Sequence, residues 1–205
     1  MAAKITQYLG QNFEPSDSAE AVVVLLHGYG SNEQALAELM PYLPRQRRWI
    51  SPRAPLPTIN NGFSWAPITV PGNPDPNEVD HATKRLWAFL DGTVGTSVKL
   101  IPIGFSQGGL MATQLLRTRP ERISKTAVLA GFVVAADQPA DAELAATRPS
   151  VLYCRGANDQ VISPDAVERT EAWLADHTRA QTRVYPRLGH SVDDRVLADL
   201  AAFFN

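Results

Sequence analysis

The sequence predicts an α/β fold, in which a mostly parallel central sheet carries helices on both faces. Short apolar runs alternate with stretches of helical periodicity along the whole chain. Several of these runs are nearly continuous, which is typical of strands buried on both faces. The 205 residues suffice for one sizeable core, and no linker, repeat or low-complexity segment divides them. We therefore expect a single domain over residues 1–205.

The first strand is expected at Ala21–Leu26, an apolar run that ends at the glycine-rich turn His27-Gly28-Tyr29-Gly30. A helix is expected next, because Asn32 can cap its start and apolar residues then recur at helical spacing until Pro44. These apolar residues are Ala35, Leu36, Leu39, Met40 and Leu43. A second short strand is expected over Arg48–Ser51.

Residues 52–77 carry seven of the 16 prolines, with asparagine and glycine between them, and predict a long surface loop. Long loops inside compact domains are commonly functional. Phe63 and Trp65 in this loop need a partner surface. They either pack the loop onto the body of the protein or line a pocket.

The rest of the chain continues the alternation of helices and strands. Helices are expected over Glu78–Asp91, Gln107–Arg119, Pro164–His177 and Asp193–Phe204. Strands are expected over Lys99–Gly104, Lys125–Ala130, Val151–Arg155 and Thr182–Tyr185. Pro102 interrupts the first of these strands, so one backbone N–H must be unnecessary at that point.

Composition narrows the possible functions. The formal net charge is -2 and no block of like charge occurs, so nothing indicates a nucleic-acid partner. Arg45, Arg47 and Arg48 form a short basic cluster, which we interpret as a solvated loop. The lone Cys154 excludes an intramolecular disulfide and is interpreted as a buried structural thiol. The N-terminus lacks a secretory signal and no apolar run approaches ~20 residues, so we expect a cytoplasmic protein without membrane insertion.

The most informative motif is Gly104-Phe105-Ser106-Gln107-Gly108-Gly109, which contains the pattern G-x-S-x-G between an expected strand and an expected helix. A serine on such a tight turn projects its hydroxyl above the sheet, and the flanking glycines avoid collisions with neighbouring backbone. This context predicts Ser106 as a nucleophile, against the alternative of a glycine-rich turn without chemistry.

A serine hydroxyl needs a base to accept its proton and an acid to orient that base. Of the four histidines, His190 follows the last expected strand and precedes the last helix. This is where the base belongs in the chain order serine, acid, histidine. His81 and His177 are interpreted as surface residues, and His27 as a structural part of the first turn. His190 is therefore the predicted base.

Asp159 is the predicted acid, because it directly follows the expected strand at Val151–Arg155 and lies between the serine and the histidine in the chain. The competing carboxylates are expected in or near the first turns of helices, where negative charge is favoured. They are Asp165, Asp193 and Asp194.

The tetrahedral intermediate of acyl transfer also needs two backbone N–H donors for its oxyanion. The N–H of Gln107, directly after the serine at a helix start, is one candidate. The N–H of Tyr29, in the first glycine-rich turn, is the other.

Four segments of the sequence resemble the phospholipase/carboxylesterase family, which includes the acyl-protein thioesterases. They are residues 27–30, residues 104–109, Asn158-Asp159-Gln160-Val161-Ile162 and Gly189-His190. The resemblance spans nearly the whole chain, and it implies an α/β-hydrolase fold without a separate lid domain. It also implies the same site residues as the chemistry above, Ser106, Asp159 and His190 as catalytic and Tyr29 and Gln107 as oxyanion donors. Residues 55–77 depart from that family's longer pocket loop, which leaves the acyl-chain length open.

These residues predict a serine carboxylesterase that hydrolyses short- to medium-chain esters of small molecules through an acyl-enzyme, without a metal or organic cofactor. The resemblance adds an acyl-protein thioesterase or a lysophospholipase as the alternative. An acyltransferase, a peptidase and a catalytically silent ligand-binding module on the same fold also stay open. Tyr29, Phe63, Trp65 and Phe132 are candidates for the acyl pocket and equally for the core. The oligomeric state is not readable from the sequence.

Overall fold

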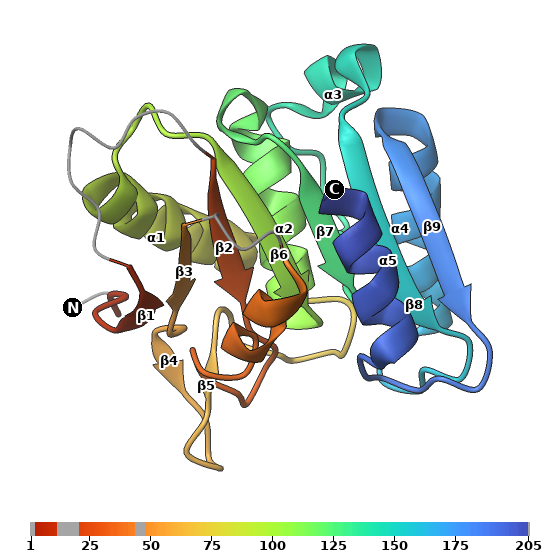
Figure 1. The fold of residues 1–205 in the computed structure, drawn as a ribbon, viewed down its shortest axis with the longest axis horizontal. Coiled ribbons are helices and arrows are strands. Elements are labelled where there is room, and N and C mark those ends of the chain that lie inside the picture. The colour runs from red at the N-terminus through yellow and green to blue at the C-terminus, as the bar shows by residue number, and fades with distance from the viewer. Residues whose placement is uncertain (1–2, 12–20, 44–47, 205) are drawn as a thin grey trace.

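The computed structural model describes residues 3–11, 21–43 and 48–204. Its centre is a seven-stranded sheet in the order β1-β3-β2-β6-β7-β8-β9 (Figure 1). The strands are β1 Tyr8–Gly10, β2 Val22–Leu26, β3 Trp49–Pro52, β6 Leu100–Phe105, β7 Thr126–Leu129, β8 Ser150–Gly156 and β9 Arg179–Tyr185. Neighbouring strands pair in parallel, except that β1 runs antiparallel to β3 at the edge. The prediction of a mostly parallel sheet is confirmed.

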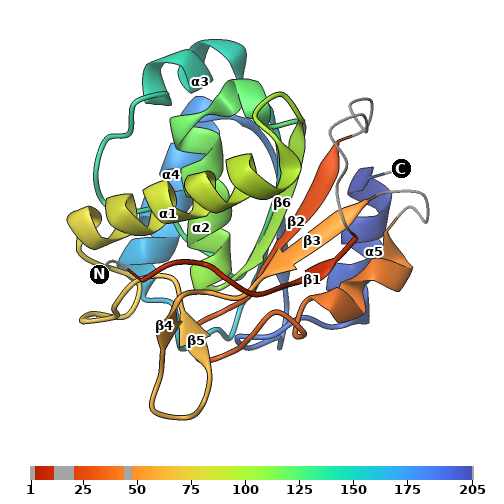
Figure 2. The same cartoon turned by 90° about the vertical axis from the view of Figure 1, so that its left-hand side faces the viewer.

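Helices cover both faces of this sheet, as Figure 2 shows from the side. One face packs against α1 Pro76–Val94, α2 Gln107–Thr118 and α4 Pro164–His177. The other face packs against α5 Asp194–Phe204 and the 3₁₀ helix η1 Ala37–Tyr42. The described residues also form two short helices, α3 Asp141–Thr147 and the 3₁₀ helix η2 Pro120–Arg122. Within the described residues, no helix is long and apolar enough to cross a membrane.

Strand β2 shows why the sequences of the buried strands are nearly continuous runs of apolar residues. Val23 and Leu25 pack on the face with α5 and η1. Val22, Val24 and Leu26 pack on the face with α1 and α2. Because helices cover both faces, alternate side chains of the strand enter two different apolar cores. The parallel arrangement also brings the carboxyl ends of the strands to one edge of the sheet, where ligand sites in such folds form.

The segment after β2 differs from the predicted α-helix, since only the short 3₁₀ helix η1 forms there. The Asn32 side chain accepts the backbone N–H of Gln34 at 2.9 Å, and so closes a turn instead of capping an α-helix. Pro41 lies inside η1 and has no N–H for a carbonyl one turn earlier, which disfavours a continuous α-helix. The prediction of an α-helix here is wrong.

The other predicted helices and strands are present with shifts at their ends. Helix α4 begins and ends where predicted, whereas β9 begins earlier than predicted, at Arg179. The strand β1, the helix α3 and the small hairpin of β4 Leu56–Pro57 and β5 Phe63–Ser64 were not predicted. The rest of the proline-rich segment is irregular up to α1, as predicted. Pro44, Arg45 and Arg47, which the sequence assigned to a helix end and a basic loop, lie outside the described residues.

Pro102 is tolerated in β6 because of where the neighbouring strands pair. β6 pairs with β2 from Leu100 to Gly104. Its pairing with β7 begins only at Ile103, one residue after the proline. The missing N–H of Pro102 therefore falls beside the start of the β7 ladder, and the strand remains regular.

Candidate active site

Ser106 lies at the sharp turn between β6 and α2. Its backbone has φ 55° and ψ -118°, a costly conformation for a residue with a side chain and the one that a nucleophile turn requires. A Cβ added to Gly104 would lie 2.0 Å from the carbonyl oxygen of Gly108. A Cβ on Gly108 would lie 1.8 Å from the carbonyl oxygen of Leu26. The two glycines therefore let the turn close while α2 touches the backbone of β2.

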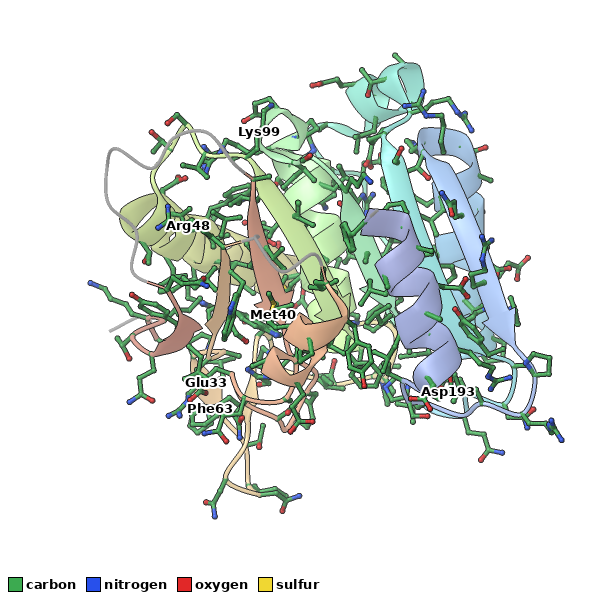
Figure 3. The ribbon with its side chains drawn as sticks, in the orientation of Figure 1. Glu33, Met40, Arg48, Phe63, Lys99 and Asp193 are labelled. Atoms are coloured by element: carbon green, nitrogen blue, oxygen red, sulfur yellow. The ribbon has the colours of Figure 1, made fainter. Side chains whose placement is uncertain are left out.

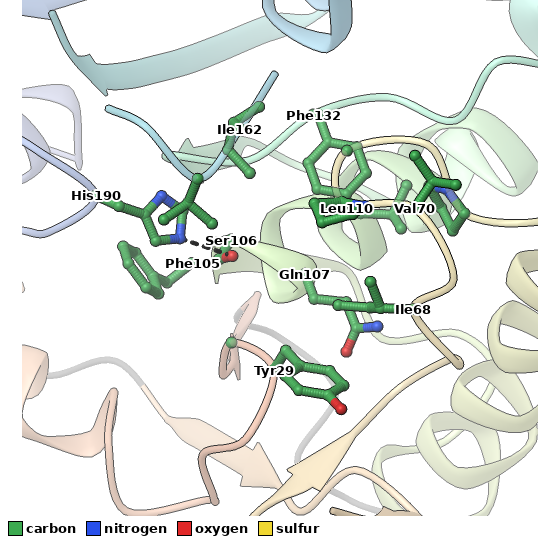
Figure 4. A pocket seen from close by; sticks show the side chains of 15 residues that line it. Tyr29, Ile68, Val70, Phe105, Ser106, Gln107, Leu110, Phe132, Ile162 and His190 are labelled. Carbon is green, nitrogen blue, oxygen red and sulfur yellow. Dashed lines mark hydrogen bonds between the residues drawn. The ribbon is translucent and has the colours of Figure 1, made fainter. Parts of the chain in front are cut away.

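Ser106, His190 and Asp159 form one hydrogen-bonded chain. His190 Nε2 lies 2.9 Å from Ser106 Oγ (Figure 4), and His190 Nδ1 lies 2.7 Å from Asp159 Oδ2. The other carboxylate oxygen of Asp159 accepts the backbone N–H groups of Val161 and Ile162 at 2.8 and 3.1 Å. With a side chain only 6% exposed, Asp159 is held by protein donors on both oxygens. This geometry allows Nε2 to take the serine proton while Nδ1–H donates to the carboxylate.

The other histidines have structural environments. His27 is fully buried, donates from Nδ1 to the carbonyl of Gly28 at 2.8 Å and accepts the N–H of Ala54 at Nε2 at 3.0 Å. Burial lowers the pKa of His27, which favours this neutral form. His177 donates to a backbone carbonyl of its own helix at 2.8 Å and stacks on a tryptophan ring, and His81 is exposed on α1. All three therefore lie outside the hydrogen-bonded chain.

The competing carboxylates lie at helix starts, as expected. Asp165 is in the first turn of α4, and Asp194 is in the first turn of α5. Asp193 Oδ1 accepts the N–H groups of Arg195 and Val196 at 3.1 and 3.2 Å, and so caps α5 (Figure 3). All three carboxylates therefore lie at helix starts, where negative charge is favoured, and Asp193 also caps its helix.

Two backbone N–H groups belong to residues that line the cavity together with Ser106. Gln107 is the first residue of α2, and Tyr29 lies in the turn after β2. Among the described residues, neither N–H has a hydrogen-bond acceptor in the protein. The Tyr29 turn is fixed on both sides, because Ser31 N–H donates to Gly28 at 3.3 Å and Gly30 N–H donates to Phe63 at 2.9 Å. Both N–H groups are thus free to bind an anionic oxygen.

The side chain of Gln107 has a separate role that the sequence did not reveal. Its Oε1 accepts the backbone N–H of Trp65 at 2.9 Å, and its Nε2 donates to the carbonyl of Ala66 at 2.7 Å. The Trp65 indole N–H donates to the carbonyl of His27 at 2.8 Å. One short piece of the proline-rich segment therefore contacts both turns that carry the free N–H groups. A buried glutamine at a helix start was the only signal for this link, and it does not specify a partner.

Phe63 and Trp65 belong to the protein body, while Tyr29 and Phe132 line the cavity at the serine. Trp65 is only 1% exposed and packs in the core beside α1 and α2. The guanidinium of Arg53 lies over the ring of Phe63, 4.7 Å from its centre, and also pairs with Glu33. Of the two interpretations left open for these residues, packing into the body holds for Phe63 and Trp65, and pocket lining holds for Tyr29. Phe132 does both, since it lines the cavity and is also buried in an apolar core cluster.

The cavity has a volume of about 400 Å³, within the range of small-molecule sites. Figure 4 shows Ser106 and His190 at one side of it. The other lining residues come from the loops after the strands and from the proline-rich segment. They are Gly28, Tyr29, Ile68, Val70, Pro71, Gly72, Pro74, Phe105, Gln107, Leu110, Phe132, Val161 and Ile162. No Asp, Glu, Lys or Arg is among these described lining residues, so the cavity suits an uncharged, apolar group.

Comparisons with known proteins agree with this description. Residues 12–205 match the family model described as phospholipase/carboxylesterase. The chain is 26% identical over 219 residues to acyl-protein thioesterase 1 of Mycosarcoma maydis, covering 89% of each chain. It is 26% identical over 202 residues to the esterase YpfH of Escherichia coli (strain K12), covering 88% of this chain and 80% of the relative. The crystal structure of the Bacillus cereus carboxylesterase has a TM-score of 0.78 at 20% identity, over 97% of this chain and 92% of that chain.

The parallel sheet, the helices on both faces and the serine turn after β6 define a protein of the α/β-hydrolase fold. In the part of the chain that the structure describes, no separate lid domain is inserted. Because the family model covers nearly the whole chain, the protein belongs to the phospholipase/carboxylesterase family, whose relatives named above are an esterase and a thioesterase.

Proposed function

We propose that this protein is a serine carboxylesterase that hydrolyses short- to medium-chain carboxylic esters. The observation that carries the proposal is the hydrogen-bonded chain of Asp159, His190 and Ser106 at the side of an apolar cavity. A nucleophile within reach of an oriented base is the arrangement that acyl transfer by serine needs. The family membership supports ester hydrolysis as the reaction.

In the proposed mechanism, Ser106 Oγ attacks the ester carbonyl carbon while His190 Nε2 accepts the hydroxyl proton. The N–H groups of Tyr29 and Gln107 stabilise the resulting oxyanion. The C–O bond to the alcohol then breaks, and His190 returns the proton to the leaving oxygen. Water repeats the same steps on the acyl-enzyme, releasing the carboxylic acid and restoring the serine. Asp159 keeps the imidazole oriented and stabilises its positive charge throughout.

The lining of the cavity supports an uncharged acyl chain as the bound group, since its side chains are mainly aliphatic and aromatic. A small-molecule ester satisfies these requirements without a further partner or cofactor. The Mycosarcoma maydis relative suggests the second candidate, an acyl-protein thioesterase. A lysophospholipase would need a place for a charged head group, and the described lining residues include no Asp, Glu, Lys or Arg for it.

The proposal is tested with p-nitrophenyl esters of two to about twelve carbons, hydrolysed by the native protein and by Ser106→Ala. The variant should lose about a thousandfold or more in kcat/KM, because the nucleophile is removed while the pocket stays. His81→Ala, which changes an exposed histidine on α1, serves as the control and should keep the native rate. Equal activity of the native protein and Ser106→Ala would refute the role of the serine.

Two further readouts separate the alternatives. Turnover of an ester and a thioester with the same acyl chain shows which class of substrate the site prefers. A native protein that neither hydrolyses esters nor reacts with a fluorophosphonate probe at Ser106 would favour the ligand-binding module instead.

A further inference from the structure

Arg169, on α4, links two wall segments of the cavity that come from different parts of the chain. Its Nη2 donates to the carbonyl oxygen of Gly72 at 2.7 Å, and its Nε donates to that of Val133 at 3.1 Å. Gly72 lies in the proline-rich segment and lines the cavity. Val133 follows the cavity-lining Phe132 in the loop after β7. One guanidinium therefore joins both walls.

The Val133 end of this link is rigid. The N–H of Val133 donates to Thr170 Oγ1 at 3.0 Å, and that hydroxyl donates to the carbonyl of Ala166 at 2.6 Å. Helix α4 thus binds both backbone polar groups of Val133, one through Arg169 and one through Thr170. The loop after β7 has a fixed position relative to the helix.

The Gly72 end packs directly against the start of α4. Its φ of +76° is one that residues with side chains rarely adopt. A Cβ added there would lie 3.0 Å from the Ala166 Cβ and 3.1 Å from Ser163 Oγ. This close contact leaves the carbonyl of Gly72 facing Arg169, and the hydrogen bond fixes the segment at that point.

The residues between this attachment and the one made by the Gln107 carboxamide form an arch, which we define as residues 67–71. The arch carries Ile68 and Val70, which line the cavity although they are 39% and 54% exposed. Figure 4 shows Val70 across the cavity from His190. The position of the arch therefore sets how far the cavity extends away from the reacting groups.

The electrostatics of Arg169 fit a positioning role. Burial lowers the pKa of its guanidinium, while Asp165 raises it and Arg117 lowers it further. Within the described residues, no carboxylate forms an ion pair with it. Its hydrogen bonds go to backbone carbonyls instead, and bonds from a charged donor are shorter and stronger than neutral ones. The charged guanidinium of Arg169 therefore holds the loop of Gly72 and the loop of Val133 through their backbone carbonyls.

We propose that Arg169 is a positioning residue that determines the acyl-chain length accepted by the cavity. By joining Gly72 to Val133, it fixes the width between the arch and the Phe132 wall. It touches neither the reacting atoms nor the hydrogen-bonded chain at the serine. The proposal rests on the function proposed above, because it assigns the acyl chain to this cavity.

The test compares kcat and KM across the p-nitrophenyl ester series for the native protein and Arg169→Gln. With the link broken, KM for esters longer than the native optimum should fall about tenfold relative to the native protein. The kcat for the two-carbon ester should stay within about twofold, because the reacting groups are unchanged. Arg169→Lys keeps the charge, but its N–H donors lie on a single nitrogen instead of the two that hold the carbonyls of Gly72 and Val133. Its chain-length profile should therefore lie between those of the native protein and Arg169→Gln.

Arg148 supplies a matched control, since it also donates to backbone carbonyls, but at the other end of α4. Its acceptors are Ala175, Asp176 and Thr178 at 2.6, 3.0 and 3.0 Å. Arg148→Gln should lower the thermal stability and leave the chain-length profile unchanged. The proposal would be overturned if Arg169→Gln leaves the chain-length profile as it is in the native protein. It would also be overturned if Arg148→Gln changes the profile in the same way as Arg169→Gln does.

A binding series makes the test independent of turnover. Calorimetry with n-alkanoates of increasing length is carried out on Ser106→Ala with and without Arg169→Gln. The double variant should bind longer chains than the single variant does. If this shift occurs although the native protein, with Ser106 in place, hydrolyses none of the esters, only the proposed function fails. If ester turnover is present and neither series shifts, only the role of Arg169 fails.

Discussion

Gly108 occupies a point where helix α2 and strand β2 meet backbone to backbone. A Cβ at this position would lie 1.8 Å from the carbonyl oxygen of Leu26 and 2.7 Å from that of His27. No rotation of a side chain can relieve such a contact, because the first atom of the side chain causes it. The residue thereby controls the distance between the Tyr29 turn and the start of α2.

We predict that Gly108→Ala lowers the free energy of unfolding by about 1–3 kcal/mol or more, through overpacking, and lowers esterase activity as the oxyanion donors separate. The matched control is Gly92→Ala, since a Cβ on Gly92 in α1 meets no atom within 4 Å. This control should gain about 0.5–1 kcal/mol, because alanine is the better helix former. Urea unfolding measures both changes, and equal stability of the two variants would contradict the clash.

At the scale of whole elements, Asp141 of α3 connects α2 and α4. Its carboxylate accepts Arg117 Nε at 2.8 Å and Nη2 at 2.6 Å, and it accepts the Trp173 indole N–H at 3.2 Å. The Arg117 guanidinium also lies 4.9 Å from the centre of the Trp173 ring. The side chain of Arg117 is only 3% exposed, and among the described residues Asp141 is the one carboxylate that pairs with it.

Burial raises the pKa of Asp141, but the Arg117 hydrogen bonds and the Gln138 N–H outweigh burial and hold this pKa below its ordinary value. The carboxylate therefore contributes stability above its unfolded-state pKa of about 3.9, and this contribution is lost as the pH falls through the lower folded-state pKa. Asp141→Asn should lose about 3 kcal/mol at pH 7, because Arg117 stays buried without its partner.

Urea unfolding at neutral pH and at about pH 3 checks this prediction, and the difference between the native protein and Asp141→Asn should shrink at the lower pH. Asp80→Asn is the control, because Asp80 forms an exposed pair with Lys84 one turn along α1. Its effect should stay below about 0.5 kcal/mol at both pH values. A pH-independent difference for Asp141→Asn would show that the carboxylate charge is not the cause.

At the scale of the whole molecule, Cys154 reports on the opening of the central sheet. It lies in β8, is 1% exposed, and its sulfur is 3.3 Å from the Tyr185 hydroxyl. That hydroxyl donates to Asp199 of α5 at 2.7 Å. The thiol therefore sits under α5 between two strands, as the structural interpretation of Cys154 predicted, and reaching it requires the helix to separate from the sheet.

Burial raises the pKa of Cys154 to about 11, so the thiol is protonated at pH 8 as well as inaccessible. We predict that a thiol reagent labels the native protein only as fast as it unfolds globally, and labels it rapidly in denaturing urea. Labelling rates measured against urea concentration should follow the unfolding curve. Rapid labelling of the native protein would show that α5 opens locally.

The sequence by itself was enough to predict the alternation of strands and helices. For α4 it also predicted the residues at which the helix begins and ends. These features follow from local signals, such as apolar periodicity, proline at a helix start and glycine at a tight turn. Ser106, Asp159 and His190 could also be selected from the sequence, because a motif and the order of elements restrict them. Their roles remain predictions until the serine is tested.

The tertiary structure decided what depends on contacts between distant segments. The segment after β2 forms η1 instead of the predicted α-helix, and Trp65 packs in the core. Phe132 is buried and also lines the cavity. The tertiary structure also gave Gln107 and Arg169 their partners in the proline-rich segment. A local pattern cannot specify such partners, because a buried amide or guanidinium can satisfy its donors with any carbonyl that the fold brings within reach.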